Sequence, residues 1–211
     1  QKPLILYNYL TSDLDSCGLN MKLDINLEDD TSMDLINISN ENAKNNFLNF
    51  RQKINIGKNS ILKNYSLDIN PTSNVKYSFK DIDLDKNSHL EYFILSKGSK
   101  FAKHDINCSL NNSHGSVALN GIIDLDNKKH HEIKTVINHN EENCKSYQLI
   151  KSVLNENSKG VYQGKIYVKS KAQKTDGYQL SRALLLNDDV EFNAKPELEI
   201  YADDVKCSHG S

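Results

Sequence analysis

The amino-acid sequence predicts an all-β protein and, among all-β folds, favours a β-solenoid in which short strands stack into a coil. Three observations lead to this prediction. Apolar residues alternate with polar ones in short runs, helical periodicity is nearly absent, and the runs from residue 116 onward recur about every 15 residues with no helix-sized gap between them. A β-sandwich is the alternative fold that short strands and polar turns also allow.

The expected strands follow one another along the chain. In KLDINL, the apolar residues Leu23, Ile25 and Leu27 alternate with polar ones, which is the period-two pattern of a half-buried strand. The segment 39–50, SNENAKNNFLNF, is expected to be a short helix or an insertion between turns of the coil. The clear alternating runs occupy 21–27, 33–39, 90–96, 116–125, 131–139, 146–154, 160–168, 178–186 and 197–202.

Composition and turn chemistry favour the solenoid over the sandwich. Good two-residue hairpin turns between matched strands are missing, whereas a sandwich usually has several. The chain contains no Trp, its hydrophobic fraction is 37%, and its mean hydropathy is −0.62, so the core must be thin and repetitive. The many Asn residues are expected to fill turns, because Asn tolerates left-handed backbone angles.

Charge and the ends of the sequence limit the partners. The formal net charge is −2 and the pI about 6.4, so no general attraction to nucleic acid or anionic lipid is expected. Arginine occurs only at Arg51 and Arg182, and Lys128–Lys129 is interpreted as a solvated face. No apolar run approaches a bilayer span, and QKPLILYNYL lacks the features of a signal peptide. The four cysteines contain no C-x-x-C pair, which indicates a reducing, cytoplasmic compartment.

The candidate site is the last segment, ELEIYADDVKCSHG. Asp203–Asp204 is expected to form a corner, because Asp side chains cap the backbone of a turn. After it, Val205, Cys207 and His209 share one face of a strand, since residues two apart point the same way. A thiolate and an imidazole are both good ligands for iron, zinc or copper. Two ligands alone do not make a metal site, and a buried Cys beside a surface His is the alternative interpretation.

Residues 174–210 carry a resemblance to a known family. The stretches GVYQGKIYV, KTDGYQ and KPELEIYADDVKCSHG occur in the order found in the β-helix of the SufD family, a subunit family of the SUF iron–sulfur cluster assembly scaffold. The sister SufB family shares the architecture but lacks the IYADDVKCSHG ending. The resemblance is strong over residues 116–210. Over 1–115 it rests on strand spacing and on PLILYNYL, which stands where the family begins its first β-helix strand.

The resemblance implies a right-handed parallel β-helix, with residues 1–211 forming one core domain that lacks the helical end domains of the family. It implies pairing with SufB and a transient iron–sulfur cluster at that interface, contacted by Cys207 and His209, with further ligands on SufB. The ATPase SufC would attach to a helical domain absent here, so this chain is expected to be a non-catalytic scaffold subunit. A flavin bound by the assembled complex is a further expectation. In a eukaryote the compartment would be a plastid-type organelle.

A second cluster of candidate ligands lies in HDINCSLNNSHG, residues 104–115. His104, Cys108 and His114 could meet across a turn at a metal or sulfur-handling site. The favoured interpretation is instead a loop with scattered polar residues and one small buried Cys.

The remaining histidines and cysteines are given structural or solvent-exposed roles. His130–His131 and His139 flank the strand EIKTVI and are expected to be exposed. Cys17 and Cys144 are taken as structural.

Two rival functions belong to other classes. A carbohydrate-active β-helix enzyme could use Asp203–Asp204 or the LEDD of 27–30, since such enzymes work with clustered carboxylates. Neighbouring residues in a strand point to opposite faces, however, and Arg is scarce. A passive structural or adhesive solenoid is the other alternative. Ser-His-Asp and P-loop patterns are absent from the sequence.

Overall fold

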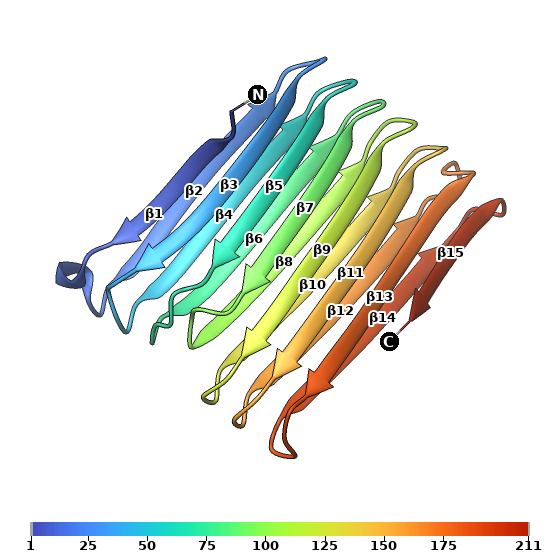
Figure 1. Ribbon diagram of the computed structural model, residues 1–211. Helices are drawn as coiled ribbons and strands as arrows, with labels where there is room; N and C mark the ends of the chain where they lie inside the picture. The colour runs from blue at the N-terminus through green and yellow to red at the C-terminus, as the bar shows by residue number, and fades with distance from the viewer. Residues whose placement is uncertain (1, 211) are drawn as a thin grey trace.

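The structure is a computed structural model that describes residues 2–210, and its strands form two parallel sheets facing each other (Figure 1). The chain alternates between the sheets, so odd-numbered strands build one and even-numbered strands the other. The prediction of an all-β solenoid is therefore confirmed. The alternative of a β-sandwich, whose sheets are antiparallel, is not the fold.

Successive turns of the coil run from β1 at one end to β15 at the other. The odd sheet consists of β1 (Leu4–Leu10), β3 (Ser32–Glu41), β5 (Ile61–Asp68), β7 (His89–Ser96), β9 (Ser116–Leu125), β11 (Lys145–Leu154), β13 (Thr175–Leu185) and β15 (Val205–Gly210). The even sheet consists of β2 (Gly18–Leu27), β4 (Phe47–Ile56), β6 (Val75–Leu84), β8 (Phe101–Leu110), β10 (His130–His139), β12 (Lys159–Val168) and β14 (Glu191–Ile200). The one described helix is the 3₁₀ turn η1 (Ser12–Leu14).

The segment 39–50, expected to be a helix or an insertion, is neither. It contains the end of β3, a turn at 42–46 and the start of β4, in register with the strands around it. Asn46 explains the difference, because its backbone N–H donates to the side chain of Asn74 (2.9 Å) and its side-chain oxygen accepts from the backbone N–H of Cys17 (2.7 Å). These Asn side chains link turns of successive coils rather than capping a helix.

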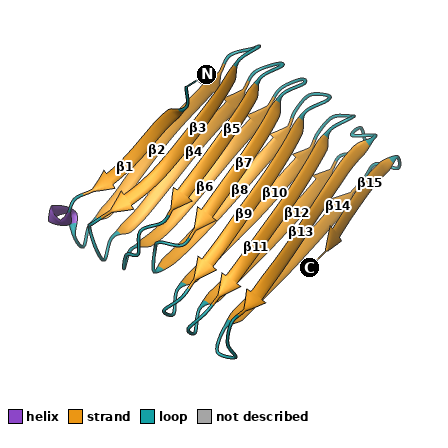
Figure 2. Ribbon diagram, in the orientation of Figure 1, coloured by secondary structure: helices purple, strands orange, loops and turns teal. Residues whose placement is uncertain are grey.

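The turns, which are teal in Figure 2, use residues other than glycine in the left-handed conformation. Six of the twelve described non-glycine residues with positive φ are asparagines, and no described glycine has positive φ. The prediction that Asn fills the turns is therefore confirmed. The asparagines with positive φ are Asn45, Asn59, Asn87, Asn127, Asn143 and Asn157.

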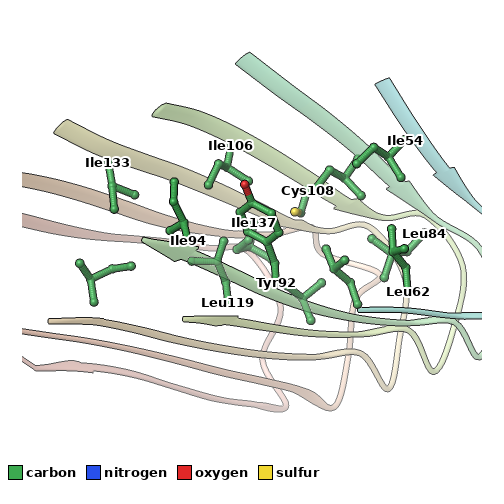
Figure 3. Close-up of a cluster of buried hydrophobic side chains, with 14 of the residues drawn as sticks. Ile54, Leu62, Leu84, Tyr92, Ile94, Ile106, Cys108, Leu119, Ile133 and Ile137 are labelled. Atoms are coloured by element: carbon green, nitrogen blue, oxygen red, sulfur yellow. The ribbon is translucent and has the colours of Figure 1, made fainter. Parts of the chain in front are cut away.

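Inward side chains of equivalent strands stack into columns along the coil. The register of the even sheet superposes Ile25, Ile54, Ile82, Cys108, Ile137, Ile166 and Leu198, which we call the aliphatic column. Five of the seven are isoleucine, whose branched side chain suits a strand. Figure 3 shows several of them, with Tyr92 and Leu119 of the odd sheet, filling the narrow space between the sheets.

A second column of the even sheet contains two buried polar residues, Lys76 and His131, among apolar ones. Leu19, Leu48, Lys76, Ala102, His131, Gly160 and Phe192 superpose near the first residue of each strand, and we call this the polar column. His131 and His139 are both fully buried, so the prediction that they are exposed is wrong. His131 lies in the polar column, where its Nδ1 lies 2.7 Å from Ser96 Oγ and its Nε2 lies 2.7 Å from the carbonyl oxygen of Ser99.

Lys76 is the centre of a buried ionic network. Its Nζ lies 2.9 Å from a carboxylate oxygen of Glu41 and 3.1 Å from one of Asp68, and all three side chains are at most one-tenth exposed. Burial acts to raise the pKa of Asp68, but the nearby Lys76, His104 and His131 together outweigh it and leave that pKa below its ordinary value. Two carboxylates and one ammonium are therefore held together inside the coil.

Candidate functional site

Cys207 and His209 lie on β15, the last strand of the odd sheet, which begins after the corner at Asp203–Asp204. The backbone N–H of Lys174 donates to the carbonyl of Asp204 (2.6 Å), and the N–H of Asp204 donates to Oε1 of Gln173 (2.9 Å). The corner is thus anchored to the preceding turn of the coil by backbone and amide groups. It fixes where β15 starts.

The register of β15 puts the two candidate ligands on the inner face of the sheet. Cys207 pairs with Gly177 and His209 with Gln179, whose side chain is fully buried between the sheets. Because side chains alternate along a strand, Val205, Cys207 and His209 share this inner face, as predicted. The α-carbons of Cys207 and His209 are separated by about 6.7 Å, two residue rises in a strand.

Glycine at position 177 leaves room for the sulfur of Cys207. A methyl group there would lie 3.3 Å from Sγ, tighter than almost all real contacts. Cys207 is a free thiol of intermediate exposure that packs against the small apolar cluster at this end of the coil, which includes Ile166 and Ala202. His209, one residue pair further along the strand, is exposed.

The thiol of Cys207 is held in its protonated form. Burial raises its pKa above the ordinary value, a backbone hydrogen bond from Gly177 opposes the shift, and the charge of Asp176 adds to it. Binding of a metal ion to this sulfur must therefore release a proton.

The pair is an incomplete set of ligands. Within residues 2–210, no group of three or more His, Cys, Asp and Glu side chains is arranged to hold a metal ion. A cluster or ion bound here would need ligands from outside the described residues. Among these residues β15 pairs only with β13.

Comparison with known proteins agrees with this assignment. A sequence model described as "SUF system FeS cluster assembly, SufBD core domain" matches residues 10–211. The chain belongs to the SufBD family. It is 32% identical to the iron–sulfur cluster assembly protein SufD of Escherichia coli over 173 residues, which cover 81% of this chain and 40% of that protein. The resemblance stated from the sequence is thereby confirmed.

Two further relatives come from photosynthetic organisms. A SufBD family protein of Synechocystis is 30% identical over 126 residues, covering 60% of this chain and 28% of that protein. The chloroplastic protein ABCI7 of Arabidopsis thaliana is 29% identical over 157 residues, covering 74% of this chain and 33% of that protein. The chain spans less than half the length of each of these curated SufBD relatives.

Among the other candidate ligands of this SufBD chain, His104, Cys108 and His114 do not converge. They do not lie on a loop as expected, because the first two are buried on β8 and only His114 is in a turn, with φ 66°. The expectation of a small buried Cys is confirmed, since Cys108 belongs to the aliphatic column and burial raises its pKa. Nε2 of His104 lies 3.1 Å from Ser96 Oγ.

The two remaining cysteines lie far from the site along the chain. Cys144 is buried at a turn, where its thiol donates to the carbonyl oxygen of Asn112 (3.3 Å), which supports a structural role. Cys17 is half-buried near the opposite end of the coil, between η1 and β2.

Sequence reasoning missed Gly177 and Gln179, the two neighbours of the site, because only the register of β13 against β15 reveals them.

The carboxylate pairs considered for a carbohydrate-active enzyme belong to turns. Asp29 belongs to the turn before β3, where its side chain accepts from the backbone N–H of Lys58 (2.8 Å). Asp203 and Asp204 form the corner before β15. Within residues 2–210 no helix is long and apolar enough to cross a bilayer.

Proposed function

We propose that this chain is a SufD-like scaffold subunit that pairs with a SufB-type partner through its C-terminal turns. Cys207 and His209 would then face the partner at the place where an iron–sulfur cluster is built as cargo. The observation that carries the proposal is the position of both side chains on one face of β15, where the described residues complete no set of metal ligands.

The incomplete ligand set suits a scaffold. A closed site with four ligands would hold its cluster firmly, whereas one thiol and one imidazole with ligands borrowed from a partner allow release. His209, which is exposed, can ligate iron through a neutral ring nitrogen. Cys207 contributes a soft sulfur ligand once its proton leaves.

Three finer points belong to the same proposal. Residues 1–211 act as a single core domain; SufC, the ATPase of the system, attaches outside this segment; and the chain itself catalyses no reaction. Its compartment is the cytoplasm of a bacterium or a plastid, in keeping with its Escherichia coli and chloroplastic relatives.

The test is cluster assembly in the full protein co-expressed with its SufB and SufC partners. We expect His209→Ala and Cys207→Ser to lower bound iron and acid-labile sulfide at least several-fold while the complex still purifies intact. Cys17→Ser is the matched control, because Cys17 is another free, half-buried cysteine but lies near the opposite end of the coil. Unchanged iron and sulfide in both site variants would refute the role of the pair.

The proposed pairing with SufB is tested separately from the binding of iron. Cysteine-reactive cross-linkers of short reach, attached at Cys207 in a variant whose other three cysteines are serine, should join this chain to SufB at a mapped residue. Cross-linking that maps only to SufC, or to nothing in an intact complex, would contradict the proposed interface. This result does not depend on whether Cys207 binds iron.

A further inference from the structure

The outer faces of the two sheets differ in chemistry. On the even sheet, outward residues are mainly polar or charged, for example Lys53, Asp81, Glu132 and Lys165. On the odd sheet, two outward columns are apolar over most of their length. We call these residues the apolar strip: Ile5, Tyr7, Ile36, Ile38, Tyr65, Leu67, Phe93, Leu95, Ile122, Leu149 and Leu180.

The strip is uncovered in the described chain, and only Asn120 interrupts its column from Ile5 to Leu180. Its two columns are formed by residues two apart on each strand, and strand pairing superposes one turn on the next. Ile5 and Tyr7 are each 55% exposed, and the strip residues from β3 to β13 are half-buried only by their neighbours on the sheet. The loops lie at the ends of the strands, so within residues 2–210 nothing crosses this face (Figure 2).

The dimensions of the strip match one helix. Residues two apart in a strand are separated by about 6.7 Å, and seven strands from β1 to β13 at about 4.8 Å spacing extend over roughly 29 Å. With side chains the strip is about 10 Å wide, the diameter of an α-helix, and 29 Å corresponds to about 19 helical residues. Its footprint of about 300 Å² is well below the roughly 800 Å² per partner of a stable dimer, so the strip suits one weakly bound helix rather than a second copy of the chain.

A groove near the middle of the strip can take a large side chain. It has a volume of about 300 Å³ and is lined mainly by Tyr65, His89, Glu91, Phe93, Ala118 and Asn120. The groove exists because Ala118 and Asn120 on β9 are small beside the aromatic rings of the strands before them. A leucine or phenylalanine from a docked helix would fill it as a knob fills a hole.

The charges beside the strip suggest the direction of the helix. Lys63 is paired with Glu91 (3.6 Å) and Lys97 with Asp124 (2.6 Å). Lys151 and Arg182, which continue one column of the strip at β11 and β13, are exposed and form no ion pair among the described residues. Two unpaired cations favour the negative end of a helix dipole and acidic side chains in its last turn.

We propose that the apolar strip is a docking surface for an amphipathic α-helix of a partner protein, lying across the strands with its acidic C-terminal end over Lys151 and Arg182. This surface is distinct from the terminal strand that carries Cys207. The proposal therefore stands or falls independently of the proposed function.

The first experiment uses a synthetic amphipathic peptide of about 19 residues, with Leu at i, i+3, i+4 and i+7, a central Phe and Glu in its last turn. Fluorescence anisotropy should show saturable binding to this chain. We expect Phe93→Lys to weaken binding at least tenfold, whereas Phe79→Lys, the matched change on the outer face of the even sheet, leaves it unchanged. Equal binding by both variants, or no binding by the wild type, would overturn the proposal.

Charge exchange provides a second, independent readout that does not disturb packing. Lys151→Glu should weaken binding of the peptide about fivefold. Replacing the peptide's C-terminal Glu residues by Lys should restore its affinity for this variant. Lys151 is exposed, so the variant will fold even where Phe93→Lys does not. A loss that the reversed peptide does not restore would refute the proposed direction of the helix.

The natural occupant is identified in the full-length protein by a photo-cross-linking amino acid at position 93 and mapping of the joined peptide. A helical segment of another polypeptide with an apolar stripe supports the proposal. Cross-links to a second copy, to a segment of the same polypeptide or to lipid would each overturn it.

Discussion

The aliphatic and polar columns of the even sheet lie at opposite ends of the same strands and differ in what they bury. They are six residues apart on each strand, or about 20 Å. The first superposes isoleucines turn after turn, whereas the second buries Lys76 and His131 at the same strand position two turns apart. The comparison shows that a thin solenoid can hold charges inside wherever each turn supplies partners to the next.

The polar column depends on neighbouring turns far more than the aliphatic column does. Lys76 on β6 is neutralised by Glu41 at the end of β3 and Asp68 at the end of β5. An isoleucine column keeps most of its contacts if one member is shortened, but an ionic network that loses its only cation leaves charges without compensation. We therefore expect the largest losses of stability in the polar column.

Replacing Lys76 by Met should have the largest effect. The change removes the buried ammonium and leaves the carboxylates of Glu41 and Asp68 facing each other without a counter-charge, which costs about 4 kcal/mol. Urea denaturation followed by circular dichroism measures the loss. Lys53→Met on the outer face of the even sheet is the control and should change stability by less than about 0.5 kcal/mol. Equal effects would mean that the network does not stabilise the coil.

In the aliphatic column, Ile82→Ala should cost about 3 kcal/mol, through lost burial and the cavity that remains. Ile82 is fully buried in the core between Ile54 and Cys108 of the neighbouring turns. The measurement is the same denaturation experiment, so the two columns are compared directly. A cost above that of Lys76→Met would reverse the ranking of the columns.

These two columns also explain how far the sequence could predict the structure. The aliphatic column is visible in it, because period-two alternation places Ile25 or Ile137 on an inner face without knowledge of any partner. The burial of His131 and His139 could not be predicted, since it depends on Ser96, Ser99 and Ser146, which only the stacking of turns brings to them. Their local sequence resembles that of exposed histidines.

The candidate site, too, could be predicted from the sequence only in part. The shared face of Cys207 and His209 follows from strand periodicity, and the sequence predicts it. Which face that is depends on pairing: the register with Gly177 and Gln179 turns both side chains inward at the end of the coil. The space that Gly177 leaves for the sulfur likewise arises from a residue 30 positions earlier in the chain.

Acidification should destabilise the coil through its buried histidines. Nε2 of His139 and Oγ of Ser146 are hydrogen-bonded (2.8 Å). Burial lowers the pKa of His139 to about 4. Its unfolded form binds a proton at about pH 6.5, so the contribution of the neutral ring to stability is complete above that pH and is lost as pH falls toward 4. Between pH 7 and pH 5 the expected loss is about 2 kcal/mol.

The variant His139→Leu tests this assignment. It places an aliphatic side chain between Leu110 and Val168, its neighbours in the stacked column. We expect the difference in unfolding free energy between pH 7 and pH 5 to shrink by about 2 kcal/mol relative to the wild type. An unchanged difference would assign the pH dependence to other buried groups, His104 first, whose pKa burial lowers to about 3.

The smallest effect is expected at the terminal strand. His209 is exposed at the open end of the coil, so His209→Ala should change the free energy of unfolding by less than about 0.5 kcal/mol. His139 and His209 occupy equally regular strand positions, yet the first is enclosed by the turns on both sides and the second has a described turn on one side only. Chemical denaturation at pH 7 checks the prediction. A loss above about 1 kcal/mol would mean that His209 supports the fold, and reduced cluster content in that variant would then report folding rather than ligation.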